Sequence, residues 1–174
     1  YNQRSTGICG ASGTAIGEIQ LVKCEHLMDF PDSHADDPQY ELTQWFELKK
    51  TVAAEVLQER NVVEKNLGES LASIVDIYQV LLADHKFGEK VESYLATGLG
   101  LLTAIKHTVR YFSDLFQSMD DPYLKARHED IDYLGDKLYQ AWLGKNSCRA
   151  TVKISAPIVL MGSHISVSDI ISLP

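Results

Sequence analysis

Apolar residues recur at intervals of three and four through most of the chain, the spacing of helices that bury one face. The pattern predicts helices over residues 38–67, 69–83, 101–119 and 121–143, with a shorter helical piece between the second and third of these. Three long helices and one broken helix, joined by short links, are typical of paired helical hairpins in a small bundle.

The first predicted helix shows the pattern most fully. Its expected buried stripe consists of Leu42, Trp45, Phe46, Val52, Val56, Val63 and Leu67. The later helices repeat the spacing with Leu71, Ile74, Val75, Tyr78, Leu81 and Leu82, then with Leu101, Ile105, Thr108, Val109, Phe112, Leu115, Phe116 and Met119.

Capping residues stand where the helices should begin. Asp37 precedes Pro38, and Asp120 or Asp121 precedes Pro122; an acidic N-cap followed by proline is a common helix start. Asp84 is the expected cap of the short helical piece, and Gly68, Gly98 and Gly100 are expected to break the chain between helices.

The last helix carries an anomaly. Leu124, Ile131 and Leu138 recur every seven residues. Leu134 and Ala141 form a second apolar seam on the same side, and Arg127 stands where an apolar residue of that seam is expected. Gly144 is expected to end the helix.

Both ends of the chain change in character. Glycine-rich turns and alternating residues predict short strands near the start, "PIVLMG" reads as a buried strand, and "SVSDIISL" as a short helix. The β–α–β order predicts an α+β, mostly α fold, with a helical-hairpin bundle inserted into an incomplete α/β subdomain. The expected parts are strands over 1–22, a linker over 23–37, the bundle over 38–144, and a truncated return into the α/β subdomain over 145–174.

Composition narrows the functional classes. The chain is 45% hydrophobic and 23% charged, and its net charge of −8 argues against a nucleic-acid partner, because phosphate backbones need clustered lysine and arginine. No apolar run reaches the roughly 18 residues of a membrane span. Three scattered cysteines suggest reduced thiols and a cytoplasmic location, and the absence of an initiator methionine suggests a piece of a longer protein.

The residues themselves indicate no catalytic or metal site. His26, His34, Asp32, Asp36 and Asp37 could be imagined as ligands, but aspartates beside prolines are more often caps and turn formers. The glycine-rich start lacks the spacing of a phosphate-binding loop. No triad or carboxylate pair can be defined, so we expect no catalytic residue, no metal and no cofactor in this chain.

One stretch resembles a known family. "MDDPYLKARHEDIDYLG" resembles the last long helix in the N-terminal half of Enzyme I, the phosphoenolpyruvate–protein phosphotransferase of the phosphotransferase system (PTS). The matching positions are Asp120, Asp121, Tyr123, Leu124, Lys125, Arg127, Asp130, Ile131, Leu134 and Gly135.

Three other stretches agree in order with the same family. "GICGASGTAIGEIQLV" resembles its opening, with Ser12 where proline is usual; "SIVDIYQVLLADHKF" and "PIVLMGSHISVSDIISLP" resemble a later helix and strand. Asp76-Ile77-Tyr78 and the Leu173-Pro174 ending lean toward the nitrogen-regulatory paralogue (PtsP type) rather than the sugar-transport enzyme.

The resemblance implies a reaction pathway. In the family, phosphoenolpyruvate phosphorylates a histidine on a phosphohistidine-type α/β subdomain, which passes the group to a histidine on a small HPr-like carrier held by the helical subdomain. A magnesium-dependent barrel binds phosphoenolpyruvate, and the full-length enzyme is expected to dimerise through regions absent here. His164 follows Met161-Gly162, which is not the family's lead-in to the active histidine, so this chain alone is expected to be inactive.

Carrier docking predicts a set of partner-binding residues. The second helix and the piece after it offer a modest apolar patch with a polar edge, suited to a transient interface. To this patch the resemblance adds residues of the last two helices. The full set is Glu69, Tyr78, Val80, Leu81, Asp84, Phe87, Phe116, Met119, Leu124 and Arg127.

Alternatives remain at several of these positions. Val80, Leu81, Phe116 and Leu124 could belong to the core, and Arg127 could pair with Asp130 or Asp120 instead of a partner. Lys86 stands where the sugar-branch family usually has an acidic residue. A non-enzymatic helical scaffold or dimerisation module is the alternative function.

Overall fold

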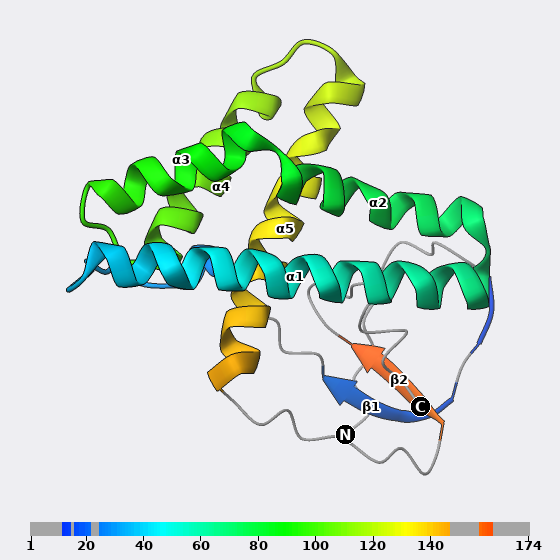
Figure 1. Ribbon diagram of the computed structural model, residues 1–174. Helices are drawn as coiled ribbons and strands as arrows, with labels where there is room; N and C mark the ends of the chain where they lie inside the picture. Colours follow the sequence, from blue (N-terminus) through cyan, green and yellow to red (C-terminus); the bar gives the residue numbers. More distant parts are fainter. Residues whose placement is uncertain (1–11, 15, 22–24, 147–156, 162–174) are drawn as a thin grey trace, which may run out of the picture. The chain divides into compact units, whose positions relative to one another are not determined.

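The computed structural model describes residues 12–14, 16–21, 25–146 and 157–161 (Figure 1). The chain divides into two compact units. One comprises Tyr1–Cys24 and Thr151–Pro174, and the other comprises Glu25–Ala150. Each is described by itself.

The first unit contains a parallel strand pair formed by the two ends of the chain. Strand β1 (Glu18–Leu21) pairs with β2 (Ile158–Met161), with Glu18 opposite Ile158. A Cβ on Gly17 would lie 2.5 Å from the carbonyl oxygen of Pro157, so glycine permits this close approach. The whole helical unit lies between the two strands in sequence, which confirms a helical bundle inserted into an α/β part. The first predicted strand and the short helix predicted after β2 lie outside the described residues.

The second unit is helical throughout. It contains the short 3-10 helix η1 (Leu27–Asp29), α1 (Pro38–Leu67), α2 (Glu69–Ala83), α3 (His85–Ala96), α4 (Leu101–Gln117) and α5 (Pro122–Asn146). Helices α1 and α2 form one hairpin and α4 and α5 another, with α3 packed on α4. Figure 1 shows α5 crossing α1 and α2, which it contacts. The predicted bundle of paired hairpins is confirmed.

The predicted helix starts are confirmed by their capping hydrogen bonds. The Asp37 carboxylate accepts from the backbone N–H of Gln39 at 2.9 Å, and Asp121 accepts from that of Tyr123 at 2.8 Å. Asp84 caps α3 in the same way. Each such bond satisfies a backbone donor that the first turn leaves unpaired, a contribution of about 1 kcal/mol.

The predicted helix breaks are confirmed at Gly68, Gly98 and Gly100 and wrong at Gly144. Gly68 and Gly98 have φ of +91° and +86°, a conformation that favours glycine. Gly144 does not end α5, which continues to Asn146. Nothing lies within 4 Å of a Cβ built on Gly144, and its φ is not left-handed, so it needs no glycine-specific turn.

The core follows the predicted stripes with two corrections in α1. Trp45, Val52, Val56 and Val63 are buried as predicted, but the side chains of Phe46 and Leu67 are 51% and 55% exposed. Phe46 lies about 100° around the helix from Trp45, and Leu67 is the last residue before the hairpin turn. Near Phe46, the residue that α1 buries is instead Leu48.

The residues before α1 are anchored to the bundle. Leu27 is fully buried. The Asp136 carboxylate accepts a hydrogen bond from the backbone N–H of Leu27 at 2.9 Å, and its other oxygen lies 2.7 Å from Nδ1 of His26. Nζ of Lys106 donates to the carbonyl oxygen of Phe30 at 2.6 Å. Because Asp136 lies on α5 and Lys106 on α4, this segment is fixed against the second hairpin.

Candidate partner-binding face

Helix α2 presents an apolar stripe that the rest of the unit leaves partly uncovered. Leu71, Ile74, Tyr78 and Leu81 are spaced by three, four and three residues and therefore share one side of the helix. Leu71 and Ile74 are 45% and 57% exposed, while Tyr78 and Leu81 are half-buried. Val80 precedes Leu81, lies about 100° from it around the helix, and is 64% exposed. The adjoining side packs inward through Ala72, Val75 and Leu82.

Tyr78 links this stripe to α5. Its ring centroid lies 4.7 Å from that of Tyr133. Burial raises the pKa of the Tyr78 phenol above its usual range, and the nearby Tyr133 and Asp130 raise it further. The phenol is therefore neutral at physiological pH, and α2 and the middle of α5 meet at a tyrosine pair.

Arg127 lies on the surface of α5, close to that junction. One guanidinium nitrogen is 2.9 Å from the Asp130 carboxylate and another donates to the Tyr123 hydroxyl, whose ring lies 4.4 Å from the guanidinium carbon. These contacts raise the pKa of Arg127, with the Asp130 hydrogen bond the largest cause. The intramolecular pair with Asp130, considered from the sequence, is therefore present.

The position of Arg127 in the apolar seam now has a physical explanation. Residues 122–126 are all exposed, and the first fully buried residue of α5 is Ile131. The first turns of α5 therefore extend past the core, so a seam position there faces solvent. An arginine is acceptable at such a position, with its guanidinium over the Tyr123 ring.

Glu69 is held by an arginine on the neighbouring helix. Arg60 of α1 places its guanidinium 2.5 Å from Glu64, 2.7 Å from Glu69 and 2.8 Å from Asp76. One cation thus joins three carboxylates across the α1–α2 hairpin. Glu69 is still 65% exposed at its side chain, so it can meet a partner only while sharing Arg60.

Phe87 requires a correction. Its side chain is only 2% exposed and packs between two other aromatic rings, 6.4 Å from Trp45 and 5.8 Å from Phe112 between centroids. The expectation that Phe87 faces a partner is wrong, because Phe87 lies on the buried side of α3 with Val91 and Leu95. Asp84 itself is exposed, although its carboxylate is engaged by the backbone of α3.

The remaining predicted residues lie around the turn between α4 and α5. Phe116 is half-buried in α4, Met119 is half-buried after it, and Leu124 is 40% exposed in α5. We call the following set the carrier face: Leu71, Ile74, Tyr78, Val80, Leu81, Phe116, Met119, Leu124 and Arg127.

The sequence did not single out Leu71 and Ile74 for this face. Both fit the spacing of Tyr78 and Leu81, so periodicity places them on one side of α2 but does not show whether another helix covers that side. Their exposed fractions show that none of the described residues buries them. The available signal was the apolar excess of α2, which has apolar residues on two sides.

Three of the five side chains considered as metal ligands form structural contacts. Asp37 caps α1, Asp32 lies 2.5 Å from Nζ of Lys106, and His26 contacts Asp136. Within the described ranges, no group of three or more His, Cys, Asp or Glu side chains could hold a metal ion. His164 lies outside the described residues. Of the helices that are described, none has the length and apolar character to cross a membrane.

Comparison with known proteins gives consistent results. The family model for PEP-utilising enzyme, N-terminal, matches residues 6–127. The phosphoenolpyruvate-protein phosphotransferase of Staphylococcus carnosus (strain TM300) is 24% identical over 164 residues, and that of Listeria monocytogenes serovar 1/2a (strain ATCC BAA-679 / EGD-e) is 25% identical. Each alignment covers 94% of this chain but only 28% of the relative, so the chain spans little more than a quarter of their length.

Two solved structures share the fold. The N-terminal domain of Enzyme 1 - Nitrogen superposes with a TM-score of 0.72 at 23% identity, covering 93% of this chain and 66% of that one. A solution structure of Enzyme I (nEIt) gives a TM-score of 0.70 at 18% identity, covering 91% and 64%. The resemblance found in the sequence is confirmed: because the family model covers well over half of its residues, the chain belongs to the PEP-utilising enzymes and represents part of their N-terminal region.

Proposed function

We propose that the helical unit docks a small HPr-like phosphocarrier protein, so that a phosphoenolpyruvate–protein phosphotransferase containing this chain can pass a phosphoryl group from its histidine to the carrier's. The observation that carries the proposal is the exposed apolar stripe of α2, which meets the middle of α5 at Tyr78 and Tyr133. Membership of the family supports phosphoryl transfer as the reaction, and the exposed stripe is the surface that we propose binds the carrier.

The composition of the carrier face suits a transient complex. Ile74, Val80 and Leu124 are 57%, 64% and 40% exposed, and a cluster of large apolar side chains in solvent commonly marks an interaction site. Charges edge it on two sides, with the Arg60 cluster near the start of α2 and the Arg127–Asp130 pair on α5. An apolar centre with a charged rim gives specific binding that can still dissociate quickly.

Docking is the whole contribution that we assign to the helical unit. Phosphoryl transfer between two imidazoles depends mainly on in-line placement of the reacting groups, and a rigid face on packed helices can provide that placement. The proposal assigns no catalytic residue to this chain and no activity to the chain alone.

Within the family we propose the nitrogen-regulatory branch and a nitrogen-branch carrier. Support comes from Asp76-Ile77-Tyr78: Asp76 binds Arg60, and Tyr78 forms the ring pair with α5, so this tripeptide shapes the carrier face. Titrating the chain with a nitrogen-branch carrier and with a sugar-branch HPr tests the assignment, which fails if the sugar-branch protein binds more tightly.

The docking experiment compares two exposed apolar residues. Fluorescently labelled carrier is titrated with wild type, with Ile74→Asp, and with Phe46→Asp as a matched control on α1. We expect wild-type affinity in the micromolar range, about −8 kcal/mol. Ile74→Asp should lower affinity at least about tenfold, because a charge enters the apolar centre, while Phe46→Asp should have no effect.

Three results would contradict the proposal. The first is no binding by folded wild type at high micromolar concentration, and the second is an equal loss in both variants. The third is self-association of the chain through Ile74, seen as a dimer in sedimentation that Ile74→Asp abolishes; this would favour the dimerisation module instead.

A further inference from the structure

The chain enters the helical unit through a short segment, residues 25–35, that side chains of α4 and α5 hold in place. This entry segment follows the first unit in sequence and precedes α1. Its first part, residues 25–29, receives its side-chain hydrogen bonds from α5, and its second part, residues 30–35, receives them from α4. The two parts are held by different chemistry.

The first part depends on one carboxylate. Oδ2 of Asp136 lies 2.7 Å from Nδ1 of His26, and Oδ1 accepts a hydrogen bond from the Leu27 backbone N–H at 2.9 Å. One turn further along α5, the Gln140 side-chain amide donates to the carbonyl oxygen of Glu25 at 2.9 Å. Only the contact of His26 changes its charge near neutral pH, because a histidine gains or loses a proton there.

The carboxylates around His26 favour its protonated form. The hydrogen bond to Asp136 is the largest cause that raises the pKa of His26, and burial opposes it. The negative charges of Asp136 on α5 and Asp29 on η1 raise that pKa further. With His26 protonated, its contact with Asp136 is a charge-assisted hydrogen bond, which is stronger than one between neutral groups.

Other titratable groups are connected to this pair through Asp132, one turn before Asp136 on α5. Asp132 interacts electrostatically with Asp136, with His128 on the same helix, and with Asp114 on α4. Burial is the main cause that raises the pKa of Asp132. His128 is therefore the second histidine whose proton could influence Asp136, and it acts only through Asp132.

The second part of the entry segment is held mainly by contacts that do not involve a histidine. Nζ of Lys106 lies 2.5 Å from the Asp32 carboxylate, and the Ser33 backbone N–H donates to the Thr103 hydroxyl at 2.8 Å. Nε2 of His107 also faces Asp32, but at 3.6 Å, which is too long for a hydrogen bond. Residues 30–35 are therefore expected to stay attached to α4 whatever the charge of His107.

We propose that His26 and Asp136 form a pH-sensitive anchor, which holds residues 25–29 on α5 while His26 is protonated and lets them detach when that proton is lost, with residues 30–35 remaining on α4. Detachment lengthens the free chain before the helical unit. Leu27 is fully buried, so its removal from the core limits detachment to brief local openings. None of these groups belongs to the carrier face, so the anchor does not depend on carrier docking.

The direction of the pH effect follows from the pKa of His26. This pKa is higher in the attached state than in the detached state, because detachment removes the hydrogen bond to Asp136. The anchor is therefore strongest below about pH 6.5, the ordinary pKa of histidine. It weakens as pH rises through the raised pKa of the attached state.

Hydrogen exchange of single backbone amides measures such openings. The isotope-labelled full chain is followed by NMR from about pH 5.5 to about pH 8.5, on either side of the histidine range. Each exchange rate is divided by that of an unstructured peptide at the same pH, which removes the ordinary pH dependence of exchange. The Leu27 amide reports on the first part of the segment, and the Ser33 amide reports on the second.

We expect the protection of the Leu27 amide to fall about fivefold as pH rises, the difference between a charge-assisted and a neutral hydrogen bond. Protection of the Ser33 amide should stay constant. The midpoint of the change at Leu27 should coincide with the pKa of His26 measured from its ring protons, and this comparison needs only the wild-type chain.

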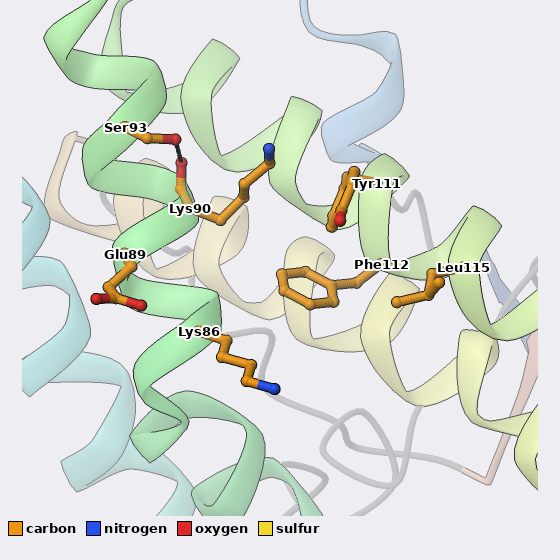
Figure 2. A pocket seen from close by; sticks show the side chains of 7 residues that line it. All are labelled: Lys86, Glu89, Lys90, Ser93, Tyr111, Phe112 and Leu115. Atoms are coloured by element: carbon orange, nitrogen blue, oxygen red, sulfur yellow. Dashed lines mark hydrogen bonds between the residues drawn. The ribbon is translucent and has the colours of Figure 1, made fainter.

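Variants identify the groups responsible. His26→Gln should remove the pH dependence at Leu27, because glutamine does not titrate. Asp136→Asn should remove it as well, although the asparagine oxygen can still accept from the Leu27 amide. The matched control is His85→Gln, which breaks another histidine–carboxylate pair, 3.2 Å from Glu89 on α3. Glu89 lines the open groove between α3 and α4 (Figure 2), and this control should behave as wild type.

Several outcomes would overturn the proposal. Constant protection of Leu27 across the pH range, or a midpoint that differs from the His26 pKa, would show that His26 does not control attachment. An equal fall at Leu27 and Ser33 would show general loosening of the bundle. A fall that persists in folded His26→Gln would assign the effect to another group, such as His128. Protection of the α4 amides shows whether each variant is folded.

Discussion

Gly135 lets α5 approach α4 and the segment before α1, and adding one methyl group there should destabilise the bundle. A Cβ at Gly135 would lie 2.8 Å from Cγ2 of Val109, 3.2 Å from its Cγ1, and 3.3 Å from Cδ2 of Leu27. Val109 and Leu27 are both fully buried. Val109 is branched at Cβ, so its χ1 is restricted and its methyl groups cannot rotate away within the helix.

The expected size of the effect follows from two opposing contributions. Overpacking a buried contact costs about 1–3 kcal/mol, and the blocked escape of Val109 places this site near the upper end. Alanine in place of glycine within a helix returns about 1 kcal/mol. Gly135→Ala should therefore lower the free energy of unfolding by about 2 kcal/mol.

Gly144→Ala is the matched control on the same helix. Nothing lies within 4 Å of a Cβ built at Gly144, so only the helix preference acts, and stability should rise by about 0.5 kcal/mol. Urea denaturation of the two variants and wild type, followed by far-UV circular dichroism, measures both changes. A Gly135→Ala variant as stable as wild type would refute the packing argument, and opposite signs for the two alanines would support it.

Three further changes test the interactions that join the helices. The hydrogen bond to Asp136 raises the pKa of His26, so protonated His26 stabilises the folded state. This stabilisation should be full below about pH 6.5 and be lost as pH rises through the folded-state pKa. In urea melts across pH, His26→Gln should remove that pH dependence of stability. Arg60→Gln should destabilise the α1–α2 hairpin less in high salt than in low salt, and equal effects in thermal melts at both would contradict its ionic role. Lys137→Met should cost about 3 kcal/mol in urea melts, because it leaves Glu59 buried without its partner 2.5 Å away, whereas adding Glu59→Leu should recover most of the loss.

Local signals in the sequence were sufficient for much of the fold. Helix spacing, the aspartate caps and Gly68 each act within one or two turns of the chain, so their effect can be inferred without the tertiary structure. The order of segments predicted strands of one α/β part at the two ends of the chain, and the structure adds that β1 and β2 pair in parallel. These predictions needed no knowledge of which helices touch.

The candidate site depended on contacts that periodicity does not encode. Phe87 and Ile74 are both apolar residues on helical stripes, yet one lies between Trp45 and Phe112 and the other in solvent. Only the packing of α3 on α4, and the lack of cover over α2 among the described residues, separates them. Arg127 is similar: its exposure follows from where α5 leaves the core.

Long-range ion pairs were also beyond sequence reasoning. Arg60 meets Asp76 across a hairpin, and Lys137 meets Glu59 across 78 positions in the chain. Charged residues are common on any helix, so neither pair stands out in the pattern. Their partners become evident only when α1, α2 and α5 are placed together.

Amide chemical-shift mapping tests carrier docking most directly. The full chain, isotope-labelled, is titrated with unlabelled nitrogen-branch carrier. The account predicts that shifts concentrate on residues 71–81 of α2 and 123–130 of α5, and that Arg127→Ala weakens binding roughly tenfold while leaving the fold intact. Shifts confined to the first half of α1, or none at all at saturating carrier, would contradict it.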